Sequence, residues 1–169
     1  MKKTFVLVAP LLCACLAGCN AKLDDPQKIV DKAIEAAGGE KYNHLDAEFD
    51  FRDKHYIAKR NNGAFSYERV FKDSLGTVHD YVTNEGFKRE INGKPVAVPD
   101  TMATKYAAST NSVNYFALLP YGLNDAAVNK KFLSEAFIND TAYYKIQVTF
   151  SKEGGGEDFE DKYLYWFNQ

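Results

Sequence analysis

The sequence has 169 residues, with 21 basic and 23 acidic side chains and a formal net charge of −2. This balance, without a clustered basic face, argues against a nucleic-acid-binding surface. The length suits one domain with a sizeable core. All three cysteines, Cys13, Cys15 and Cys19, lie near the N-terminus. The sequence therefore predicts no disulfide framework, no thiol catalysis and no cysteine metal site in the rest of the chain.

The first eighteen residues have the pattern of a bacterial export signal. Lys2 and Lys3 precede an apolar stretch from Thr4 to Leu16, which is too short to span a bilayer as a helix. The stretch ends in Leu16-Ala17-Gly18-Cys19, which resembles the lipobox of bacterial lipoprotein signal peptides. The alternative is an ordinary secretory signal that happens to contain cysteine.

The lipobox predicts cleavage before Cys19 and attachment of acyl chains to its thiol. Several chains at one point would anchor the protein stably to a membrane. The predicted organisation is a lipoprotein signal peptide at 1–18, a lipidated tether at 19–25 and a single domain at 26–169. In the tether, Lys22, Asp24 and Asp25 loosely resemble an acidic surface-export signal, and a solvated linker is the alternative.

Helical periodicity follows the tether and then gives way to alternation. Asp25 and Pro26 suit the N-cap and the first turn of a helix, which Gly38-Gly39 ends. From Leu45 onward, apolar and polar residues alternate in short runs separated by turn residues, a pattern that predicts an antiparallel meander. Asn92-Gly93, between predicted strands at 88–91 and 95–98, is the sharpest hairpin signal.

A helical insertion is predicted after Pro99. Asp100 suits the cap of a helix through Ser109, and a second helical piece covers 113–119. An apolar loop without a regular period follows at 118–123, and Asp125 suits the cap of one more short helical turn. Strands are predicted at 131–138, 143–150 and 162–167, with a flexible acidic loop at 152–161. The predicted fold class is α+β: a curved antiparallel sheet, forming an incomplete half-barrel, with an N-terminal helix and a helical plug insertion.

Four stretches carry a resemblance to a known family: Phe49 to Tyr56, Asn111 to Asp125, Lys145 to Phe150 and Gly154-Gly155-Gly156. They resemble a family of Gram-negative outer-membrane lipoproteins that has no established activity. That family looks distantly similar to the Lol-type lipoprotein carriers and to periplasmic stress-sensor lipid-binding domains. The resemblance implies a curved, incompletely closed sheet with a helical plug, and acyl chains bound between them. It also implies further strands after the last one here, so the chain is expected to be C-terminally incomplete relative to the family.

Aromatic and aliphatic side chains in the helical insertion are the main candidates for a binding site. A plug that merely completes the core is an equally good interpretation. The predicted ligand-binding residues are Met102, Tyr106, Tyr115, Phe116, Leu119 and Tyr121.

No pattern in the sequence predicts catalysis or a metal site. His44, His55 and His79 lack metal-ligand spacing, and no nucleophile elbow or phosphate loop occurs. On a strand, Asp53 and His55 would share one face while Arg52 and Tyr56 share the other, so the four residues do not form one constellation.

Three tripeptides match the Asp-(Ser/Thr)-aliphatic pattern of bacterial O-glycosylation, at Ser74, Thr101 and Thr141. Ordinary turn and cap chemistry favours the same residues and is the alternative.

Taken together, these patterns predict a non-enzymatic outer-membrane lipoprotein that binds a lipid or another hydrophobic ligand. It is predicted to need no cofactor or metal. Its expected partners are the membrane, reached through the lipid on Cys19, and acyl chains, with no nucleic acid. The rival functions are an interaction module for a glycan or a protein partner, on the surface or in the periplasm, and a hydrolase whose site has not been recognised.

Overall fold

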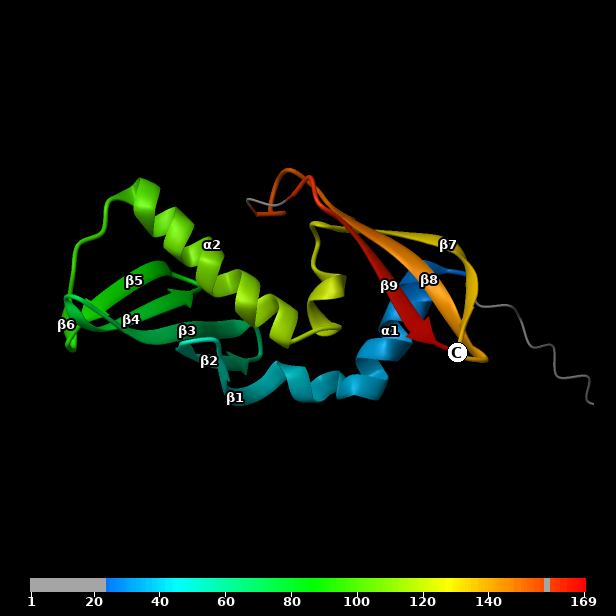
Figure 1. Cartoon of the computed structure of the whole chain (residues 1–169), viewed down its shortest axis with the longest axis horizontal. Coiled ribbons are helices and arrows are strands. Elements are labelled where there is room, and N and C mark those ends of the chain that lie inside the picture. Colours follow the sequence, from blue (N-terminus) through cyan, green and yellow to red (C-terminus); the bar gives the residue numbers. More distant parts are fainter. Residues whose placement is uncertain (1–23, 157–158) are drawn as a thin grey trace, which may run out of the picture.

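Two antiparallel sheets and two main helices form the protein in the computed structural model, which describes residues 24–156 and 159–169 (Figure 1). The α+β class and the antiparallel pairing predicted from the sequence are confirmed, and the described strands close no barrel. The predicted signal peptide and Cys19 lie outside the described residues.

The first helix, α1 (Pro26–Ala37), starts and ends as its sequence predicts. The Asp25 carboxylate accepts a hydrogen bond from the backbone N–H of Gln27, at 3.0 Å, and caps the N-terminus. Gly38, with φ of 149°, caps the C-terminus. A short 3-10 helix, η1 (Gly39–Asn43), then leads into the first strand.

The larger sheet is a meander in which each strand pairs with the next. The alternating runs and their turns place its strands at β1 (His44–Phe51), β2 (Lys54–Asn61), β3 (Ala64–Asp73), β4 (Gly76–Thr83), β5 (Gly86–Ile91) and β6 (Lys94–Pro95). The Asn92-Gly93 turn forms as predicted, because both residues have the positive φ that a tight hairpin needs, 51° and 73°. Only two residues pair beyond it, fewer than the predicted 95–98.

The helical insertion differs from the prediction. It is one continuous helix, α2 (Asp100–Ala117), where two pieces were predicted. Pro99 occupies the N-cap position and Asp100 lies in the first turn, so the capping role predicted for Asp100 was wrong. A 3-10 helix, η2 (Tyr121–Asn124), ends at Asp125, so Asp125 follows the last helical turn and does not cap a new one.

The smaller sheet contains the three C-terminal strands, β7 (Val128–Ile138), β8 (Thr141–Phe150) and β9 (Lys162–Asn168). The two sheets lie toward opposite ends of the long axis, and α2 crosses the larger one and points toward the smaller one (Figure 1). The strands therefore form two separate sheets, where a single sheet was predicted.

Each sheet has its own apolar core. Helix α1 packs against the smaller sheet, where Ile29 and Val30 meet Ile146 and Val148. The core of the larger sheet is smaller and centres on Ala58, Tyr67 and Leu118. The N-terminal helix thus covers the C-terminal strands, and α2 covers the meander.

Candidate functional site

An aromatic cleft of about 240 Å³ lies between the C-terminal half of α2 and the smaller sheet. Tyr115 and Phe116 line it from the helix, and Val128, Phe150 and Tyr163 line it from the strands. The Tyr115 ring meets Phe116 and Phe150 edge-on, at centroid distances of 5.7 and 6.2 Å. The Phe116 ring lies 5.8 Å from that of Tyr163. Such edge and offset contacts are favourable for aromatic side chains, so the walls of the cleft are mutually supported.

A second hollow, of about 390 Å³, lies on the other side of Phe116. Phe116 and Ser112 line both spaces, and Phe49 and Phe51 of β1 form the opposite wall of the second. The side chains of Phe51 and Phe116 are 45% and 47% exposed. Neighbouring large apolar side chains left in water commonly mark a binding surface.

Two glycines shape the surroundings of the cleft by having no side chain. A Cβ at Gly155 would overlap the carbonyl oxygen of Ser151, and a Cβ at Gly122 would overlap the ring of Tyr115. Gly154, Gly155 and Gly156 line the cleft, although the sequence indicated only a hairpin loop there. The close approach at Gly122 fixes where the Tyr115 ring lies.

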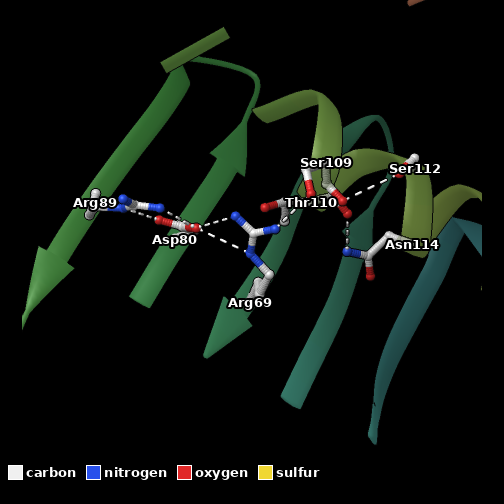
Figure 2. A network of polar contacts seen from close by, with 7 residues as sticks. All are labelled: Arg69, Asp80, Arg89, Ser109, Thr110, Ser112 and Asn114. Carbon is white, nitrogen blue, oxygen red and sulfur yellow. Dashed lines mark hydrogen bonds and ion pairs between the residues drawn. The ribbon is translucent and has the colours of Figure 1, made fainter. Parts of the chain in front are cut away.

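A buried ionic network lies beneath α2, across β3, β4 and β5 (Figure 2). Asp80 is fully buried and accepts hydrogen bonds from both Arg69 and Arg89, the shortest from each at 2.6 Å. Arg69 also donates to the Ser109 hydroxyl on α2 at 2.8 Å. The Arg89 guanidinium lies 3.8 Å from the centre of the Tyr106 ring. These contacts hold the helix on the sheet, and the hydrogen bonds to Asp80 raise the pKa of Arg89 above its ordinary value.

The face that α2 buries is polar. Thr110 and Asn114 are fully buried, and the Asn114 amide donates to the Thr110 carbonyl at 3.0 Å (Figure 2). The Thr110 hydroxyl and the Asn114 side-chain oxygen are buried without a hydrogen-bond partner among the described residues. The fully buried residues of this helix therefore form no apolar seam, and its contacts with the ionic network help to hold it on the sheet.

The structure brings two of the six predicted ligand-binding residues, Tyr115 and Phe116, to the cleft. Met102 and Tyr106 lie nearer the other end of α2, where Tyr106 packs on Arg89. Leu119 is partly buried and packs against the core that α1 forms with the smaller sheet, and it lines neither of the two spaces.

Tyr121, the last of the six, lies beside the cleft and lines a small neighbouring pocket. Its ring stacks on Tyr42 at 4.9 Å and lies 4.6 Å from the Arg60 guanidinium. Arg60 was not among the residues predicted to form the site.

Two of the histidines, His55 and His79, lie on the opposite face of the larger sheet from α2. His55 contacts Asp50 at 2.8 Å, and His79 contacts Glu68 at 2.8 Å and the Tyr81 hydroxyl at 2.8 Å. As predicted, Arg52, Asp53, His55 and Tyr56 form no single cluster, because Tyr56 is buried on the α2 face. Across residues 24–156 and 159–169, no group of three or more acidic, histidine or cysteine side chains is placed to hold a metal ion.

The three predicted O-glycosylation positions are exposed. Ser74 lies in the β3–β4 turn, Thr101 in the first turn of α2 and Thr141 at the start of β8. At Ser74 the turn is stabilised by Asp73, whose carboxylate accepts the backbone N–H of Leu75 at 2.7 Å. This hydrogen bond is the ordinary turn chemistry that is the alternative explanation for the Asp-Ser-Leu pattern. O-glycosylation of the three residues stays a prediction.

The described residues thus form a two-sheet α+β protein with an aromatic cleft between α2 and the smaller sheet. Residues 2–169 match the model of DUF6503, described as a family of unknown function, and the chain belongs to that family. Neither a curated protein nor a solved structure matches it.

Proposed function

We propose that this protein is a lipid-anchored, non-enzymatic lipoprotein of the outer membrane that binds a lipid or another hydrophobic ligand in the aromatic cleft. The observation that carries the proposal is the pair of spaces that share Phe116 in their lining, a cleft with aromatic walls and some polar groups and a second hollow that is mainly apolar. Ligand pockets are typically about 300–1,000 Å³ and mostly apolar, with a few polar groups. Cleft and hollow together offer space of that order to a chain that bends around Phe116.

The energetics favour an acyl chain over a compact polar ligand. Each methylene moved from water into an apolar space contributes about 0.8 kcal/mol. Covering Phe51 and Phe116, each nearly half exposed, adds to this gain. Burying about ten methylenes contributes about 8 kcal/mol, and the cost of immobilising the chain, about 4 kcal/mol or more, reduces the net affinity to roughly millimolar without a polar or charged contact.

The chemistry around the cleft supports a binding role. Ser109 and Ser112 line it, but Ser109 accepts a hydrogen bond from Arg69, and Ser112 donates to the Ser109 carbonyl. Neither serine has a histidine beside it, because His55 and His79 project from the other face of the sheet. A nucleophile paired with a base is what hydrolysis by serine would need.

Phe116→Asp is expected to weaken binding of a hydrophobic fluorescent probe about 10-fold or more, since it puts a charge between the two spaces. Because Phe116 is exposed in the free protein, the melting temperature should change by less than about 2 °C. Probe titration and thermal melts of the full chain test this prediction.

Phe137→Asp is the matched control, since Phe137 is 74% exposed and lines neither space. It should leave probe binding unchanged. Equal binding by both variants and the wild type would refute the cleft as the binding site.

Membrane attachment through Cys19 is the second part of the proposal. Its support is the Leu16-Ala17-Gly18-Cys19 lipobox. Cys19→Ala should abolish labelling by radioactive palmitate and move the protein from the membrane to the soluble fraction. The proposed lipid anchor would be refuted if Cys19→Ala still sediments with membranes and the wild type takes up no palmitate label.

One observation favours the rival function, an interaction module. Leu164 and Trp166 are 44% and 43% exposed on the outer face of the smaller sheet, where Lys145 lies 5.3 Å from the Trp166 ring centre. An exposed aromatic flanked by a polar side chain suits a glycan or a protein partner. Trp166 is the only tryptophan, so a shift of its fluorescence on titration with glycans, without probe binding in the cleft, would favour this function.

A further inference from the structure

Arg60, on β2, is a half-buried cation that forms no salt bridge with a carboxylate among residues 24–156 and 159–169. It donates to the Tyr67 hydroxyl at 2.6 Å and to the Tyr121 hydroxyl at 2.9 Å. Its Nε is buried and has no hydrogen-bond partner among the described residues. Burial lowers the pKa of Arg60, but the two tyrosines more than offset this effect, so the group keeps its charge. A buried donor on a charged group is costly to leave unpaired, so Nε is poised for an acceptor.

Tyr115 presents a second unpaired donor nearby. Its hydroxyl is buried and has no hydrogen-bond partner among the described residues. Burial raises the pKa of Tyr115 far above its ordinary value, so the hydroxyl stays protonated. The backbone of Gly122 packs against the ring and fixes its position.

The two groups line one small pocket of about 60 Å³, together with Asn111 and Asp125. Tyr115, Asn111 and Asp125 also line the aromatic cleft, so the pocket adjoins its inner end. A space of this size admits one small polar group or about two waters. The apolar cleft and the polar pocket thus form adjoining compartments.

One cation, Arg60, and one acidic side chain, Asp125, line the pocket. Arg60 and Lys130 both act on Asp125, the one acidic side chain that lines it. Burial raises the pKa of the Asp125 carboxyl, although both cations act to lower it. Because its pKa is raised, Asp125 takes up a proton more readily when a second carboxylate enters the pocket. Asp125 and the entering carboxylate can then share one proton.

We propose that this pocket binds the carboxyl group of a fatty acid whose hydrocarbon chain occupies the aromatic cleft. One carboxylate oxygen accepts from Arg60 Nε, and the other accepts from the Tyr115 hydroxyl. Hydrogen bonds from a charged donor to a carboxylate are the strong kind, about twice as strong as neutral ones. The inference rests on the proposed function, because it names the class of ligand for the same cleft.

The experiment compares decanoic acid with 1-decanol, which has the same chain length and no charge. Both are titrated calorimetrically into the full chain carrying Cys19→Ala, so that no attached acyl group competes. The variants are Arg60→Met and Tyr115→Phe. Lys59→Met is the matched control, since Lys59 is exposed and neighbours Arg60 on the same strand.

Arg60→Met should weaken decanoic acid binding about 10-fold or more, and Tyr115→Phe about 5-fold. Decanol binding should change less than 2-fold in either variant, and Lys59→Met should bind both ligands like the parent. Tyr115→Phe should also melt no lower than the parent, because it removes a buried hydroxyl that has no partner. The Tyr115→Phe variant therefore keeps the proposal testable if Arg60→Met fails to fold.

The outcomes separate the inference from the proposed function. Unchanged decanoic acid binding in Tyr115→Phe and in a folded Arg60→Met would overturn the carboxyl pocket while leaving the cleft. An equal loss of acid and alcohol binding would also overturn it, because the two residues would then only support the fold. If neither ligand binds the parent chain, the proposed function itself fails.

Discussion

Asp80→Ala is expected to lower the free energy of unfolding of the larger sheet by about 3–5 kcal/mol. Asp80 is fully buried and is the only acidic partner that the described ion pairs give to Arg69 and Arg89. Removing it leaves two guanidinium groups close together, one of them 5% exposed, with no carboxylate between them. The repulsion between the two guanidinium groups and their burial away from water account for most of this loss of stability, because the deleted Asp80 side chain itself contributes little packing.

Helix α2 should loosen in the same variant. Its described polar contact with the sheet passes through Arg69 to Ser109, and its aromatic contact passes through Arg89 to Tyr106. Asp80 orients both arginines, so its loss should increase amide exchange along α2 before the sheet unfolds. The cleft residues on the same helix should then bind ligand less tightly.

Urea unfolding measures the loss, with Asp46→Ala as the control, because Asp46 is exposed on β1. A second comparison separates charge burial from general disruption. Replacing Arg69, Asp80 and Arg89 together by Met, Leu and Met should recover much of the lost stability, because a complete buried ion network often exchanges for apolar residues at little cost. A loss below about 1 kcal/mol in Asp80→Ala would show that the network does not stabilise the fold.

The local elements could be predicted from the sequence because each depends on neighbouring residues. Pro26 with the Asp25 cap marks the start of α1, and Asn92-Gly93 marks a hairpin, without reference to the rest of the molecule. Alternation indicates that a segment is a strand, but not which sheet it joins. The division into two sheets depends on long-range pairing, and the single predicted sheet was wrong for this reason.

Helix α2 was divided in two because its buried positions, Thr110 and Asn114, are polar. Hydrophobic periodicity is the main sign of a docked helix, and it fails where the helix docks on charged groups. The same polarity concealed the network beneath it. The two predicted helical pieces are therefore one regular helix, whose C-terminal half bears the cleft residues Tyr115 and Phe116.

Arg60 was missed at the candidate site, although the sequence carried a signal for it. Alternation along β2 places Arg60 on the same face as Tyr56 and Ala58, which are both buried. A charged residue on an apolar strand face either pairs internally or serves a ligand. Leu119, an apolar residue in an irregular segment that was predicted to bind the ligand, packs against the core of the smaller sheet.

Val30→Asp is expected to destabilise the smaller sheet by about 4 kcal/mol or more, because it places an unpaired charge at a fully buried position. Val30 and Ile29 are the buried residues of α1, whose main contacts with strands are to β7 and β9. The core of the larger sheet shares no residue with this contact. The loss of stability should therefore be confined largely to the smaller sheet and α1.

Hydrogen exchange gives the test, because it reports each sheet separately. In Val30→Asp the amides of β7–β9 should lose protection, while those of β2–β4 stay close to wild type. Ala36→Asp is the control: Ala36 is exposed on the same helix, so the same charge should cost less than about 1 kcal/mol there. Equal loss of protection in both sheets would show that they unfold as one unit, and the two cores would then be a single cooperative structure. Wild-type protection throughout would show that α1 is not docked on the C-terminal strands.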